Sequence, residues 1–217
     1  LDQHDTYEQA RKDNEGETQW WVGLEPSEYI IPDLMKAPSQ TIMASRPGVG
    51  KTSTALALAK AVGEGNIFKV RGLDVKLDPR PVLWIQNDQP AHKLLEDLED
   101  MGINPDEACN GSTKWLHLKR HYQLDHTFEF RDWCREIKPG LVVIDSIGSC
   151  STACTVQEKD KAFANPMYWV GQRNGMPDDR GGFPQCAVLY LHHFNKSGTI
   201  RGTEYLAAAV DETWVCL

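Results

Sequence analysis

The stretch Ser45-Arg46-Pro47-Gly48-Val49-Gly50-Lys51-Thr52 decides the fold of this 217-residue chain. It matches the pattern GxxxxGK[ST] except at its first position, where Ser45 stands in place of glycine. An apolar run over residues 41–44 precedes it, and an Ala- and Leu-rich segment without glycine or proline follows over residues 52–62. A strand, a glycine-rich loop and a helix are the context that this pattern requires, so we interpret it as a phosphate-binding loop rather than a chance turn.

Each position of this loop has a physical role in holding phosphate. Gly48 and Gly50 let the backbone curl so that successive N–H groups face phosphate oxygens. The following helix directs its positive end to the same point, Lys51 reaches the β- and γ-phosphates, and the Thr52 hydroxyl can ligate Mg²⁺. The residues expected to bind the nucleotide are Ser45, Arg46, Pro47, Gly48, Val49, Gly50, Lys51, Thr52 and Ser53.

The rest of the chain alternates continuous apolar runs with helical segments. We expect buried strands at residues 41–44, 81–85, 115–118, 141–144, 187–191 and 213–217. We expect helices over residues 52–62, 91–101, 128–138 and 165–173. This alternation predicts an α/β fold with a mostly parallel, twisted sheet that is covered by helices on both faces.

Two carboxylates follow predicted strands and are candidates for hydrolysis chemistry. Asp145 ends the clearest buried strand, and beside a phosphate-binding loop it can hold magnesium through water. Asp88 follows the strand at 81–85, at the edge where open α/β sheets place their ligands, and it can orient the attacking water. The structural alternatives are a turn or helix-capping role for Asp145 and a capping role for Asp88.

A histidine pair and a basic loop follow the next predicted strand. His193, which comes after His192 at the end of the strand, can contact a γ-phosphate and transmit its loss to the loop that follows. That loop carries Lys196 and Arg201, which could contact nucleic-acid phosphates or the nucleotide of a neighbouring subunit. The competing interpretations are a structural histidine and ordinary solvated charges.

Composition limits the class of protein. The formal net charge of −8 argues against a wide basic surface for nucleic acid, although a local basic loop remains compatible with it. The six cysteines include no CxxC pair, which favours free thiols in a reducing cytoplasm.

Residues 1–19 are polar and predict a linker or N-terminal arm before an ATPase domain over residues 20–217. We expect that domain to be truncated at its C-terminus.

The order of four segments resembles the RepA-like hexameric ATPases, which are relatives of the DnaB-type replicative helicases within the RecA-like class. The resemblance covers about residues 21–217. The four segments are SRPGVGKTSTALALA, PVLWIQNDQPAHKLLEDLEDMG, LVVIDSIG and AVLYLHHFNKSGTIRGTEYLAAAVDETW. Only the first is specific by itself, and the order and spacing of all four carry the resemblance.

The resemblance implies catalytic roles for Lys51, Asp88, His193 and Arg201. Asp88 stands where the family usually has a glutamate base, and its shorter side chain puts the rate of hydrolysis in question. His193 falls at the position of a γ-phosphate sensor, and Arg201 is the best candidate for an arginine finger. Thr52 and Asp145 would hold Mg²⁺ beside ATP.

The resemblance also implies an assembly and partners. We expect a cytoplasmic, hexameric ring that acts as a replicative helicase on single-stranded DNA of a plasmid, phage or mobile element. DNA would contact loops 148–165 and 195–203, and a primase or polymerase domain could belong to the full-length protein; no membrane is expected. Two alternatives stay open: a RecA- or RadA-like recombination filament, and a nucleotide-switched regulatory ATPase that does not move along DNA.

Overall fold

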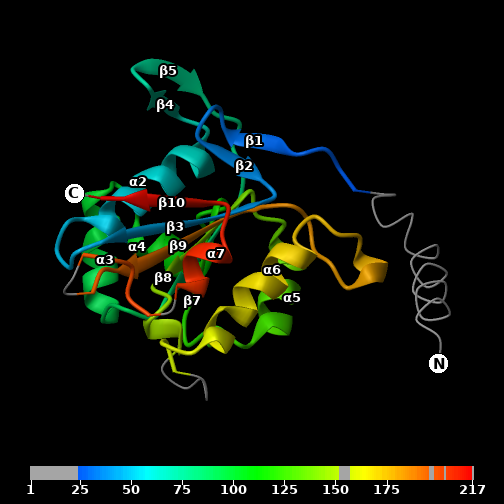
Figure 1. Ribbon diagram of the computed structural model, residues 1–217. Coiled ribbons are helices and arrows are strands. Elements are labelled where there is room, and N and C mark those ends of the chain that lie inside the picture. The colour runs from blue at the N-terminus through cyan, green and yellow to red at the C-terminus, as the bar shows by residue number, and fades with distance from the viewer. Residues whose placement is uncertain (1–23, 152–156, 196–197, 203, 217) are drawn as a thin grey trace, which may run out of the picture.

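A computed structural model describes residues 24–151, 157–195, 198–202 and 204–216. At its centre lies a six-stranded sheet in the order β10-β3-β9-β8-β6-β7, and all neighbouring strands are parallel (Figure 1). The strands are β3 (Ser39–Ser45), β6 (Val82–Gln86), β7 (Leu116–Lys119), β8 (Leu141–Asp145), β9 (Ala187–His193) and β10 (Glu212–Val215). The predicted parallel α/β fold is therefore confirmed.

The sheet has a core on each face because successive strand residues point to opposite sides. In β6, for example, Trp84 lies in one core while Leu83 and Ile85 lie in the other. The first core is closed by α2 (Lys51–Glu64), α3 (Ala91–Asp100) and α4 (Pro105–Asn110). The second is closed by α5 (Thr127–Ile137), α6 (Asn165–Arg173) and α7 (Tyr205–Ala208). Because helices cover both faces of the described sheet, ligands can approach its strands at their ends.

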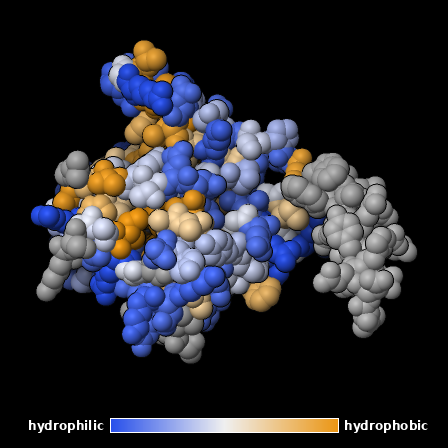
Figure 2. Space-filling view, viewed as in Figure 1, coloured by the Kyte–Doolittle hydropathy of each residue, from blue (hydrophilic) through white to orange (hydrophobic). Residues whose placement is uncertain are grey.

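Two small antiparallel hairpins add to this core and were not predicted. One pairs β1 (Glu28–Ile31) with β2 (Met35–Ala37). The other pairs β4 (Ile67–Val70) with β5 (Leu73–Lys76) through a turn at Arg71 and Gly72, which both have positive φ, and it projects from the body of the protein (Figure 1). Figure 2 shows apolar surface on this projecting hairpin, where Ile67 and Leu73 are exposed.

The interpretation of residues 148–165 as a loop is wrong for part of that segment. Short 3₁₀ turns form at Ser149–Ser151 and Lys161–Ala164. Cys150, Phe163 and Ala164 are buried in the second core. Burial of these apolar side chains is favourable and anchors both ends of the segment, although the residues around them are small or charged. Residues 152–156 lie outside the described residues.

Other expectations fall partly or wholly outside the described chain. The polar segment at 1–19 lies outside it, as does Leu217, while the last strand occupies Glu212–Val215. No helix in the described part of the chain is long and apolar enough to cross a membrane.

Candidate nucleotide-binding site

The polar residues singled out from the sequence meet at one end of the sheet. Parallel pairing places Ser45 of β3 opposite His193 of β9, and Gln86 of β6 opposite Asp145 of β8. Because these strands are parallel, their carboxyl ends share one edge, which is the usual ligand position in open α/β sheets.

The phosphate-binding loop leaves the buried end of β3 and turns directly into α2. Residues 46–50 are exposed, and α2 begins at Lys51. Gly48 and Gly50 have φ values of 81° and 91°, in the left-handed region that side chains disfavour. A Cβ at either glycine would meet no atom within 4 Å, so backbone conformation rather than crowding requires glycine here.

Lys51 points back into the loop and contacts two side chains. Its Nζ lies 3.1 Å from Ser45 Oγ and 3.2 Å from His193 Nδ1. Burial lowers the pKa of Lys51, and the nearby carboxylates of Asp145 and Asp88 partly oppose this shift. The Ser45 hydroxyl thus gives the lysine an acceptor that glycine could not supply, which is a physical reason for the departure at this position.

The contact with Lys51 determines how the His193 ring is protonated. An ammonium group only donates, so Nδ1 accepts and the proton of the neutral ring sits on Nε2. Burial and the Lys51 charge both lower the pKa of His193, which favours this neutral form. Nε2 faces Asp88, with 4.0 Å to Oδ2. One imidazole therefore lies between the lysine and the carboxylate expected to activate water.

Thr52 and Asp145 bring two oxygen groups together. The Thr52 hydroxyl donates to Asp145 Oδ2 at 2.8 Å, and Asp145 is 2% exposed. Burial raises the pKa of Asp145 to about 6, while the Thr52 hydrogen bond and the Lys51 charge counteract the shift. A hydroxyl and a carboxylate side by side are hard oxygen ligands that fit Mg²⁺, which usually takes few protein ligands and keeps several waters.

Asp88 lines a cavity of about 460 Å³. Its side chain is 40% exposed, and its Oδ1 accepts a hydrogen bond from Ser146 Oγ at 3.2 Å. His193, Glu158 and Arg201 line the same cavity. An exposed carboxylate at this position can reach water, as the predicted role of Asp88 requires.

Arg201 is paired within its own chain. Its Nε lies 2.8 Å from Glu158 Oε2, and its backbone oxygen lies 2.8 Å from Nε2 of the buried His192. Lys196, the other basic residue expected in this loop, lies outside the described residues. Within this chain, Arg201 therefore pairs its charge with Glu158.

Sequence reasoning missed three residues of this site. Gln86 is buried and contacts Asp145; Ser146 contacts Asp88; and Glu158 holds Arg201. A polar residue ending an apolar strand could have marked Gln86. Glu158 had no comparable signal, because it follows Asp145 by 13 residues inside a segment without regular pattern.

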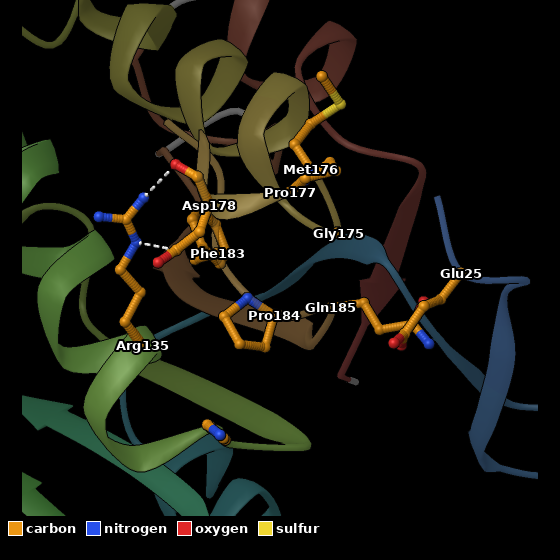
Figure 3. Close-up of a pocket in the computed structure, with 10 residues that line it drawn as sticks. Glu25, Arg135, Gly175, Met176, Pro177, Asp178, Phe183, Pro184 and Gln185 are labelled. Carbon is orange, nitrogen blue, oxygen red and sulfur yellow. Dashed lines mark hydrogen bonds and ion pairs between the residues drawn. The ribbon is translucent and has the colours of Figure 1, made fainter. Parts of the chain in front are cut away.

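A second cavity, of about 340 Å³, lies at the opposite end of the sheet, where β8 and β9 begin (Figure 3). Its Arg135 is already bound to Asp178, with 2.6 Å from Nε to Oδ1 and 3.1 Å from Nη2 to the backbone oxygen. None of the residues predicted to bind nucleotide lines this cavity. The candidate site is therefore the end of the sheet that carries Lys51.

Comparison with known proteins identifies the domain. A family model described as an AAA domain matches residues 17–199. The chain belongs to this family. A KaiC-like protein from the hyperthermophilic archaeon Pyrococcus horikoshii OT3 has a similar fold: the TM-score is 0.60 at 12% identity, over 88% of this chain and 80% of that one. A comparison with curated proteins gives no match. Family and fold together establish this AAA domain as a RecA-like P-loop ATPase.

Proposed function

We propose that this AAA domain is a magnesium-dependent motor that hydrolyses ATP, forms a hexameric ring and acts on single-stranded DNA as a replicative helicase. The observation that carries the proposal is the connection between the phosphate-binding loop and the basic loop after β9. His193 contacts Lys51 through Nδ1, and its backbone oxygen accepts the N–H of Arg201 at 2.9 Å.

The basic loop is built as an extension of β9. Phe194 and Ile200 form an antiparallel bridge, and the N–H of Asn195 donates to the Thr199 oxygen at 2.8 Å. Movement of His193 would therefore be passed to the paired residues Phe194, Asn195, Thr199 and Ile200. Coupling of this kind, in which a side chain at the γ-phosphate biases a following loop, is a known way to convert hydrolysis into motion.

The proposed chemistry assigns each side chain one task. Lys51 would hold the β- and γ-phosphates, and Asp88 would orient and deprotonate the attacking water. Thr52 and Asp145 would hold Mg²⁺, which when bound neutralises charge that develops on the phosphate oxygens. His193, neutral and with its proton on Nε2, would sense the presence of the γ-phosphate.

The ring assembly gives Arg201 a second proposed role. To reach the nucleotide of a neighbouring subunit, its guanidinium would have to leave Glu158. Glu158 would then act as a resting partner for the finger between catalytic cycles. A primase or polymerase domain in the full-length protein is part of the same proposal.

Single-stranded DNA binding separates this proposal from a nucleotide-switched regulatory ATPase, an alternative that stays compatible with the net charge of −8. With ATP and Mg²⁺ present, we expect an oligodeoxynucleotide to bind, to stimulate hydrolysis, and to lose affinity steeply as salt increases. The expected slope of log K against log salt is about −0.7 for each phosphate contact. Fluorescence anisotropy across a salt series measures it.

The basic loop supplies the matched variant. Lys196→Ala should weaken DNA binding and reduce the magnitude of the salt slope by the equivalent of roughly one phosphate contact. Lys93→Ala, a substitution on α3, should leave both the affinity and the slope unchanged. An absence of binding at every salt concentration would exclude the DNA motor and favour the regulatory ATPase. Open filaments instead of closed rings in negative-stain images with ATP and DNA would favour the recombination class.

A further inference from the structure

Gln86, the last residue of β6, connects the two acidic residues of the site, Asp88 and Asp145. It is fully buried, and its amide oxygen accepts the backbone N–H groups of Asp88 at 2.7 Å and Gln89 at 3.3 Å. Its amide nitrogen donates to Asp145 Oδ2 at 3.4 Å and to Gln89 Oε1 at 3.2 Å. Both ends of one side chain are thereby occupied, one by the turn that carries Asp88 and one by Asp145.

The hydrogen bonds of Gln86 belong to a larger connection between the turn after β6 and the end of β8. Gln86 and Asp145 are directly paired across β6 and β8, and the Asn87 N–H donates to the backbone oxygen of Asp145 at 3.0 Å. The turn after β6 is therefore tied to the end of β8 by both backbone and side chain. Asp88 is also held from the β8 side by the Ser146 hydroxyl.

The short side chain of Asp88 makes this turn important. An aspartate carboxylate stands only one methylene from the backbone, so its position follows the backbone of the turn closely. Misplacing a reacting group by about 1 Å can lower a rate by about a hundredfold. The shortest hydrogen bond of Gln86, at 2.7 Å, is the one that fixes the Asp88 backbone.

We propose that Gln86 is a positioning residue for ATP hydrolysis, which sets the location of Asp88 relative to Asp145. The inference rests on the proposed hydrolytic function and adds a fully buried residue that would act through Asp88. It predicts that loss of the Gln86 amide lowers kcat while nucleotide binding, which we assign to Lys51 and the phosphate-binding loop, is maintained.

The first test is Gln86→Met, which keeps the length of the side chain and removes its polar atoms. We expect kcat to fall about 30-fold or more, with the KM for ATP changed less than about threefold. The affinity for ADP without Mg²⁺, measured by calorimetry, should stay unchanged. This binding measurement does not depend on turnover.

Gln40→Met is the matched control. Gln40 is also a buried glutamine, 5% exposed, with its amide bound to the Ala209 oxygen and the Tyr190 hydroxyl near the start of β3. Both substitutions remove a satisfied buried amide, so both should reduce stability in urea by a similar amount. Only Gln86→Met should reduce kcat.

A double-mutant cycle separates positioning from general destabilisation. If Gln86 acts through Asp88, then adding Gln86→Met to Asp88→Asn should lower kcat less than about twofold further. If Gln86 only stabilises the fold, the reductions in kcat caused by the two substitutions should multiply. Gln86→Glu is not suitable for the cycle, because it would place a second buried carboxylate beside Asp145. Gln86→Leu, which also lacks the amide, replaces Gln86→Met in the cycle if that variant does not fold.

The outcomes distinguish this inference from the function on which it rests. If the unsubstituted protein hydrolyses ATP and the Gln86 variants match it in kcat, or if the losses simply multiply, the positioning role is overturned and the proposed hydrolysis stands. If the unsubstituted protein is no faster than Lys51→Ala, the hydrolytic function itself is overturned, and the role of Gln86 with it.

Discussion

Replacing Asp145 by asparagine should strongly reduce magnesium-dependent ATP hydrolysis and stabilise the nucleotide-free protein at pH 7.5. The carboxylate is the proposed magnesium ligand, and its loss should lower kcat by a factor on the order of 10³. Burial raises its pKa from 3.8 to about 6, so above pH 6 the folded protein holds a buried charge that the unfolded chain solvates. Asparagine removes that cost, worth on the order of 1–3 kcal/mol.

The sign of this effect sets its pH dependence. Between about pH 4 and pH 6 the folded state binds a proton that the unfolded state has released, so the wild-type protein regains stability as pH falls through that window. The advantage of Asp145→Asn in urea unfolding should therefore be full at pH 7.5 and absent at pH 4. Asp132→Asn, at an exposed position, is the control. Lower stability of Asp145→Asn at pH 7.5, or a retained hydrolysis rate, would contradict the assignment.

Asp88→Asn should lower kcat by about 10² to 10⁴ with little change in nucleotide affinity. Asparagine can still accept the Ser146 hydrogen bond but cannot take a proton from water. Asp88→Glu keeps a carboxylate base but displaces it by one methylene, so it should retain more activity than Asp88→Asn and less than the unsubstituted protein. Steady-state rates with ATP and calorimetry with ADP measure both effects. Equal rates for the Asn variant and the wild type would place the base elsewhere.

The local elements of the fold were largely readable from the sequence. The bounds of α6 agree with the expected 165–173, where Pro166 sits in the first turn and Arg173 ends the helix before a turn at Gly175. The β4–β5 hairpin was missed because its strands have only four residues each, although Leu73–Lys76 alternates apolar and charged side chains. Its turn, Arg71-Gly72, was the remaining signal.

The parts of the site that one local motif defines could be predicted from the sequence. The contacts that depend on the order of strands in the sheet could not. The phosphate-binding loop and Asp145 follow from local patterns. The contact between His193 and Lys51 requires β9 to lie beside β3, which no local pattern states. The same holds for Gln86, which meets Asp145 only because β6 and β8 are neighbours, and for Glu158, which reaches Arg201 through the fold.

The proposed hydrolytic function depends on Lys51 as the phosphate ligand of the loop. The most direct test compares steady-state ATP hydrolysis, with Mg²⁺, by the unsubstituted chain and by Lys51→Ala. Removing a buried ammonium that would hold the β- and γ-phosphates should reduce the rate at least a hundredfold. Equal rates in the two proteins would contradict hydrolysis at this site.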